Sequence, residues 1–172
     1  ISIGNGTVRR LVDSHYEDTM PRWSRSGQAI YYCSKRGAKG DADFQIWRVE
    51  TDSGRTALVA RDSLGEYAEH FKDRDLFFTR GSTVWQKNLT DAGEIPVSQL
   101  RGINIGNYWD LAGDNLFFLT LNQGKKPILS RLELSSGDIH TIMEVDALPQ
   151  YSLPRMSISP NGKMVAIASI KI

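Results

Sequence analysis

The sequence contains very little cysteine, no long hydrophobic run and no excess of charge of one sign. Its 172 residues include one cysteine, Cys33, which excludes an intrachain disulfide and a cysteine-rich metal site. Apolar runs extend for only a few residues, so the sequence predicts neither a transmembrane helix nor a signal-peptide core. The formal net charge is +1, and interspersed acidic and basic residues exclude the basic footprint of a nucleic-acid-binding domain.

Catalytic and cofactor-binding motifs are also absent. The sequence has no Gly-x-Ser-x-Gly nucleophile motif, no His-Glu-x-x-His motif, no phosphate-binding loop and no dinucleotide glycine motif. The histidines, His15, His70 and His140, are far apart, so we expect no catalytic residue, no cofactor and no metal site. Aspartates in the turns, such as Asp52 and Asp91, are expected to accept backbone hydrogen bonds there.

A strand–turn–strand pattern that returns along the chain is the main positive feature. In its first copy a strand ends at Trp23-Ser24, Gly27 forms the turn, and Ala29 to Tyr32 form the next strand. The pattern returns at offsets of 86 and 135 residues, giving Trp109-Asp110, Gly113 and Leu116 to Phe118, then Ile158-Ser159, Gly162 and Val165 to Ile167. The repeat therefore predicts the fold far better than it predicts a ligand.

The period of the repeat indicates a β-propeller. Counted at Ile30, Leu76, Leu116 and Val165, the spacings are 46, 40 and 49 residues, with four short strands in each round. Stacked blades bury both faces of each sheet, and we expect this core to include the tryptophans Trp23, Trp47, Trp85 and Trp109. A β-sandwich also uses short strands, but it does not predict a repeating turn-and-aromatic pattern.

We therefore predict an all-β fold, a β-propeller of four-stranded antiparallel blades in a single domain, residues 1–172. Three full blades are expected at residues 21–60, 66–98 and 108–143, and two terminal half-blades at residues 1–12 and 155–172. The Asn5-Gly6 turn predicts a hairpin in the first half-blade. Residues 63–72 also have helical spacing, but the repeat favours a strand there.

The terminal half-blades leave two arrangements open. They combine into a four-bladed ring, or the chain is an arc of a larger ring, which we favour. An arc exposes edge strands that tend to pair with another chain, so a homodimer is a further expectation. Because the sequence opens at Ile1 in what reads as mid-strand, we expect it to be a piece of a longer protein.

Several motifs resemble those of a known family. Trp23 to Tyr32, Gln45 to Val49 and Ser157 to Lys163 resemble the WD-repeat-like blades of TolB-type propellers. Tyr108 to Leu111 and Leu153 to Ile167 look like the end of the propeller in CadC-type winged-helix transcriptional regulators. Related blades also occur in TolB itself and in the gating propeller of prolyl-oligopeptidase-type serine peptidases.

The resemblance to CadC-type regulators implies a function. It implies a non-enzymatic sensor on the periplasmic face of a bacterial inner membrane, with the membrane tether and the DNA-binding domain outside this chain. The alternatives are the gating propeller of a serine peptidase and a TolB-like periplasmic scaffold. The expected partner is a protein or a small-molecule signal, with no direct binding to nucleic acid.

The loops between successive blades supply the candidate contacts. Each of these loops carries a tyrosine, and such loops gather on one face of a propeller, where partners bind. A structural role at a repeat position is the alternative. The partner-binding candidates are Tyr16, Tyr67, Tyr108 and Tyr151, with Glu66 and Asn107 beside two of them.

Overall fold

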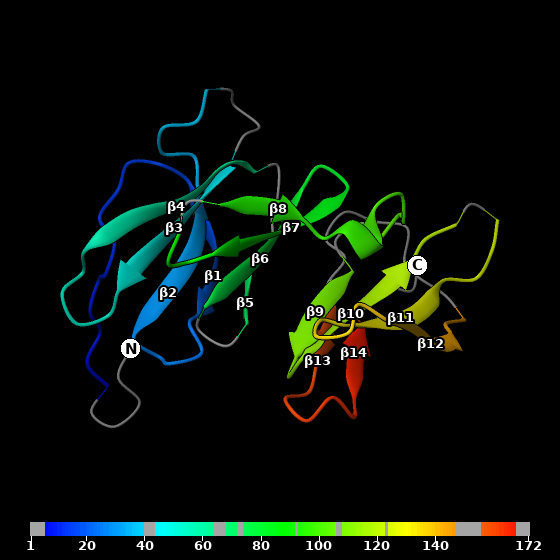
Figure 1. Ribbon diagram of the computed structural model, residues 1–172. Helices are drawn as coiled ribbons and strands as arrows, with labels where there is room; N and C mark the ends of the chain where they lie inside the picture. Colours follow the sequence, from blue (N-terminus) through cyan, green and yellow to red (C-terminus); the bar gives the residue numbers. More distant parts are fainter. Residues whose placement is uncertain are drawn as a thin grey trace. The chain divides into compact units, whose positions relative to one another are not determined.

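The structure, a computed structural model, describes residues 6–39, 44–63, 68–71, 74–91, 93–105, 108–122, 124–146 and 156–167. The chain divides into two compact units, Ile1–Ala68 and Glu69–Ile172. Strands and turns dominate the described residues, with one short 3-10 helix (Figure 1). In this part of the chain, no helix has the length and apolar character needed to cross a membrane.

The first unit contains one four-stranded antiparallel sheet, the first sheet. Its strands lie side by side in chain order (Figure 1). Aromatic and β-branched residues fill its two middle strands, as their strand propensity favours. The strands are β1 (Asp18–Trp23), β2 (Ala29–Ser34), β3 (Phe44–Glu50) and β4 (Thr56–Ser63).

The second unit contains two further four-stranded antiparallel sheets and a two-stranded one. The second sheet comprises β5 (Ala68–Phe71), β6 (Asp75–Arg80), β7 (Thr83–Asn88) and β8 (Glu94–Pro96), followed by the 3-10 helix η1 (Ser98–Leu100). The third sheet comprises β9 (Trp109–Ala112), β10 (Asn115–Thr120), β11 (Ile128–Glu133) and β12 (Ile139–Glu144). The last pair is β13 (Met156–Ile158) and β14 (Val165–Ile167). The predicted fold class is confirmed, and residues 68–71 form a strand rather than a helix.

The inner strands of the second unit are buried on both faces. In β10 the four central residues are buried although they alternate between the two faces of the sheet. One face contributes Phe117 and Leu119 to a core with Tyr108, Met156 and Ile158, which joins the third sheet to the last strand pair. The outermost strand, β12, is exposed throughout. This gradient from inner to outer strand is what stacking of blades predicts.

The repeat at an offset of 135 residues is confirmed down to single hydrogen bonds. The amide of Ser24 donates to the carbonyl of Ala29, and the amide of Ser159 donates to the carbonyl of Met164. The Ser24 hydroxyl also accepts a bond from the amide of Ala29 at 3.0 Å, and the Ser159 hydroxyl accepts one from the amide of Met164 at 2.9 Å. Gly27 and Gly162 have φ of 73° and 69°, in the left-handed region that favours glycine.

The turn between the third and fourth strands of a sheet repeats as well. The amide of Gly54 donates to the carbonyl of Glu50 at 2.9 Å, and the amide of Gly137 donates to the carbonyl of Glu133 at 2.8 Å. Asp52 caps the first of these turns by accepting a bond from the amide of Ser53, which lowers the carboxyl pKa. Asp91 likewise accepts a bond from the amide of Gly93 at 2.8 Å. The predicted role of the turn aspartates is therefore confirmed.

The prediction that Trp23 is a core residue is wrong. Trp109 is fully buried, whereas Trp23 is 64% exposed. Trp23 lies at the end of the edge strand β1 and pairs with Ile30 next to the turn, but Trp109 pairs with Phe118, further from its turn. Strand β1 also contains a register shift at Met20, whose φ is 55°. The two tryptophans that the offset of 86 residues aligns in sequence therefore occupy different positions in their sheets.

The second strand of the expected terminal hairpin is not formed, because residues 7–12 are described without any strand. Residues 1–5, which would supply the first strand, lie outside the described residues. The segment 7–12 lies beside the β3–β4 turn, where the guanidinium of Arg9 donates to the carbonyl of Asp52 at 3.0 Å. A segment forms a strand only when its backbone groups pair with those of a neighbouring strand. The bond of Arg9 comes from its side chain, so it does not make this segment a strand.

Candidate functional site

The predicted partner-binding residues are placed very differently. Tyr16 is 52% exposed, as a contact residue on a loop should be. Tyr67, Tyr151, Glu66 and Asn107 lie outside the described residues. For these positions partner binding stays a prediction.

Tyr108 belongs to the core of the second unit. It is 5% exposed and packs in the cluster that includes Phe117, Leu129 and Met156. Burial raises the pKa of its phenol. The structural alternative for this repeat position therefore holds at Tyr108, whose ring is not available to a partner.

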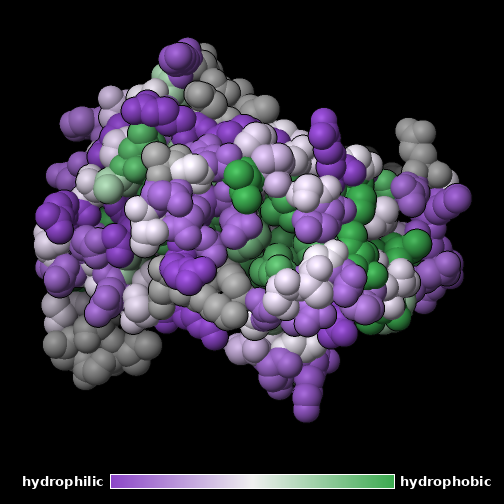
Figure 2. Space-filling model, in the orientation of Figure 1, coloured by the Kyte–Doolittle hydropathy of each residue, from purple (hydrophilic) through white to green (hydrophobic). Residues whose placement is uncertain are grey.

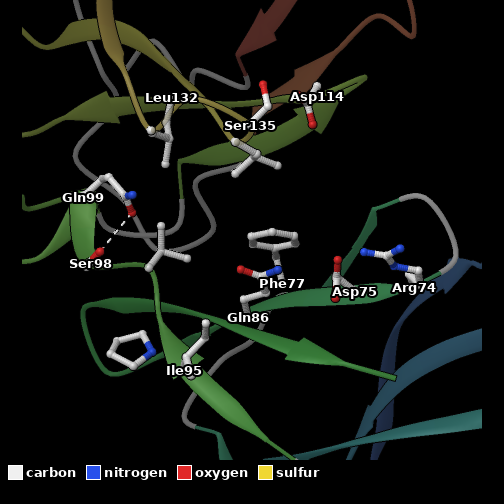
Figure 3. Close-up of a pocket in the computed structure, with 14 residues that line it drawn as sticks. Arg74, Asp75, Phe77, Gln86, Ile95, Ser98, Gln99, Asp114, Leu132 and Ser135 are labelled. Carbon is white, nitrogen blue, oxygen red and sulfur yellow. Dashed lines mark hydrogen bonds between the residues drawn. The ribbon is translucent and has the colours of Figure 1, made fainter. Parts of the chain in front are cut away.

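A pocket of about 640 Å³ lies within the second unit, between the second and third sheets (Figure 3). Its floor is one cross-strand row, in which Phe77 of β6 pairs with Gln86 of β7, and Gln86 pairs with Ile95 of β8. Because residues directly opposite each other in antiparallel strands point to the same face, all three side chains point toward the third sheet.

The walls of the pocket come from η1 and from two turns of the third sheet. Ser98 and Gln99 lie at the start of η1, and the serine hydroxyl donates to the Gln99 Oε1 at 3.2 Å. Asp114 lies in the β9–β10 turn, and Ser135 and Gly137 lie in the β11–β12 turn. A Cβ at Gly137 would lie 3.0 Å from the Gln99 Nε2, so this glycine lets the two walls approach.

The polar groups of the pocket are unevenly buried. Asp75 is 8% exposed, and its Oδ1 accepts a bond from the Nδ2 of Asn88 at 3.1 Å. Arg74 beside it is exposed. The side-chain amide of Gln86 is half-buried and makes no hydrogen bond with any residue that the structure describes. Gln86 therefore offers both a donor and an acceptor to whatever enters.

A buried hydrogen bond beyond the pocket holds the two sheets together. The indole Nε1 of Trp109 in β9 donates to the hydroxyl of Thr79 in β6 at 2.9 Å. Thr79 lies on the same face of β6 as Asp75 and Phe77, so the face that lines the pocket also carries this link. Because this link joins the two sheets, the pocket depends on the packing of the second sheet against the third.

Three side chains could hold a metal ion. Glu133, Asp138 and His140 each present a ligand atom within 4.8 Å of the others, on the β11–β12 hairpin. His140 lies on the exposed edge strand β12, and the sequence did not indicate Glu133 beside it. His15 lies in the first unit and His140 in the second, and the side chain of His70 lies outside the described residues.

None of the residues lining the pocket was predicted as a site residue. Asp114 follows Gly113 in a turn that the sequence does predict, so its surface position could be foreseen. Gln86 carries a weaker signal, as a polar residue in the middle of the strand β7. Which sheet it faces depends on tertiary packing.

Comparison with known proteins supports the fold. No protein-family profile and no curated protein matches the sequence. TolB from Acinetobacter baumannii is similar in structure, with a TM-score of 0.66 and 16% identity, over 91% of this chain and 39% of TolB. An oligogalacturonate lyase in complex with manganese has a TM-score of 0.70 and 8% identity, over 93% of this chain and 49% of the lyase. A puromycin hydrolase has a TM-score of 0.60 and 12% identity, over 90% of this chain and 26% of the hydrolase.

These similarities concern the fold. All three identities are at or below 16%, a level at which folds persist while functions diverge. The chain spans between 39% and 49% of the length of the first three similar structures. It therefore shares the TolB-type β-propeller fold over less than two thirds of such a protein.

Proposed function

We propose that this chain is a non-enzymatic recognition part of a β-propeller, and that it binds a protein or small-molecule ligand in the pocket between the second and third sheets. The pocket itself carries the proposal, because its volume of about 640 Å³ is that of a ligand site. Among its described lining residues there is no histidine or cysteine, and Ser98 bonds to an amide rather than to a base. That lining suits binding better than catalysis.

The finer proposal is that this recognition part is the sensor of a membrane-bound, CadC-type transcriptional regulator. The motifs at residues 108–111 and 153–167 support it. The sensor would lie on the periplasmic face of a bacterial inner membrane. The folds of TolB and of the puromycin hydrolase support the two alternatives, a TolB-like scaffold and the gating propeller of a peptidase.

The coding sequence on either side of this chain tests the finer proposal. We expect a winged-helix domain and one transmembrane helix before Ile1. A hydrolase domain after Ile172 would favour the peptidase alternative, and a signal peptide without a winged helix would favour the scaffold. Solution mass over a range of concentrations tests the expected homodimer, which a strict monomer would contradict.

Nuclear magnetic resonance of the ¹⁵N-labelled chain tests the recognition site. In a screen of peptides, saccharides and nucleotides, we expect shifts at the amides of Gln86, Ile95 and Ser135. Replacing Ser135 by Trp should fill the pocket and abolish the shifts. The matched control Ser136→Trp, on the same exposed turn but outside the lining, should preserve them. Shifts confined to other parts of the chain, or none, would contradict the proposal.

A further inference from the structure

The floor of the pocket places one amide between two hydrophobic neighbours. Gln86 pairs with Phe77 on one side and with Ile95 on the other, in a single row across three strands. Its amide makes no hydrogen bond with the described residues, so its C=O and its NH₂ group are both available to a ligand. A side-chain amide in this position matches a backbone peptide group, which also presents one donor and one acceptor.

The remaining lining disfavours other classes of ligand. Saccharides are commonly bound on exposed aromatic faces, but Phe77 is the one aromatic residue among the described lining residues and is only 1% exposed. Phosphates and other anions need several cations or an array of donors. Here the lining contains one cation, Arg74, and two carboxylates, Asp75 and Asp114, which gives it a formal charge of −1.

An exposed apolar side chain beside Gln86 completes the match. Ile95, on the edge strand β8, is 60% exposed. Figure 3 shows Ile95 and Gln86 reaching into the same hollow from neighbouring strands. Hydrophobic surface is also exposed elsewhere on the part of Figure 2 that the second unit occupies, and at the pocket it adjoins the amide of Gln86.

We propose that the pocket binds a short extended peptide segment. Its backbone amide pairs with the side chain of Gln86, and one apolar side chain packs on Ile95. This inference rests on the proposed function and gives it a ligand class. The negative charge of the lining further selects neutral or basic peptides over acidic ones.

Selection from a randomised heptapeptide phage library on the full 172-residue chain tests the inference. Synthetic copies of the enriched peptides are then titrated against each variant by fluorescence polarisation. We expect Gln86→Leu to weaken binding about tenfold, because it removes the hydrogen bonds and keeps the size of the side chain. Gln28→Leu, on an exposed turn of the first unit, is the matched control and should bind like the wild type.

Ile95→Ser provides a second variant if Gln86→Leu fails to fold, because a side chain 60% exposed contributes little to stability. It should weaken the same peptides. The inference is overturned if every enriched peptide binds Gln86→Leu and Ile95→Ser as tightly as it binds the wild type. If a saccharide array or the mixed screen still gives ligands whose shifts map to the pocket, the proposed function stands and the peptide class fails. If nothing shifts the pocket amides, both fail.

Discussion

The indole N–H of Trp109 and the hydroxyl of Thr79 form a buried hydrogen bond of 2.9 Å between two neighbouring sheets. Both side chains are almost fully excluded from solvent, at 0% and 1% exposure. In such surroundings a hydrogen bond lost from one partner is not replaced by water. This bond therefore fixes how the sheets that form the pocket face each other.

Replacing Thr79 by Val should lower the free energy of unfolding by about 1–3 kcal/mol, because the shape is kept while the acceptor is lost. Urea denaturation of the whole chain measures the change. Thr141→Val, on the exposed strand β12, is the control and should change stability by less than about 0.5 kcal/mol. Equal stability of the two variants would show that the bond does not hold the sheets together.

A second buried bond fixes the last strand pair to the third sheet. The Oδ2 of Asp110 accepts a bond from the amide of Ile158 at 2.7 Å, and Asp110 is 5% exposed. Asp110→Ala should cost about 1–3 kcal/mol, because the Ile158 amide then stays buried without this acceptor. Hydrogen exchange should become faster at Ile158 and through β13 and β14, while the β10–β11 amides change little. Asp110→Asn retains an oxygen acceptor and should preserve most of the protection.

The two equivalent serine turns should respond differently to the same substitution. Ser24 is 5% exposed and its hydroxyl accepts from the buried amide of Ala29, whereas Ser159 accepts from the amide of Met164, a residue 69% exposed. Ser24→Ala should cost about 1–2 kcal/mol, because no water replaces the lost acceptor. Ser159→Ala should cost less than about 0.5 kcal/mol, because water reaches the freed amide.

Chemical denaturation of the two alanine variants measures this difference. Ser24→Thr keeps a hydroxyl and serves as the control for the buried site. Equal losses at the two positions would mean that the turn geometry, rather than burial, determines the contribution of the hydroxyl.

The strands of this protein could be predicted from sequence because each turn carries its own local signal. Gly27 and Gly162 adopt the left-handed conformation that their place in the repeat requires. Side-chain burial could not be read the same way, since Trp23 and Trp109 share a motif but differ in pairing register and in exposure. The pocket was missed for a related reason. Gln86 becomes a floor residue only when the second sheet packs against the third, which no local pattern encodes.

The buried phenol of Tyr108 should make stability depend on alkaline pH. Desolvation raises its pKa above the ordinary value of 10.0. A tyrosine with a raised pKa keeps its proton in the folded state at a pH where the unfolded state loses it. Its contribution to the free energy of unfolding is therefore complete below pH 10.0 and declines as the pH rises above that value. The free energy of unfolding should therefore fall more steeply above this pH in the wild type than in Tyr108→Phe.

Spectrophotometric titration of tyrosinate gives an independent measure of the same effect. Subtracting the curve of Tyr108→Phe from that of the wild type should give one tyrosine that titrates above the ordinary pKa. Tyr32, whose pKa burial also raises, should contribute equally to both curves and cancel. Tyr16→Phe is the control, because this side chain is 52% exposed and removing it should leave the late titration in place. An ordinary pKa for Tyr108 would mean that solvent reaches its hydroxyl, and the alternative of an accessible, partner-binding Tyr108 would then return.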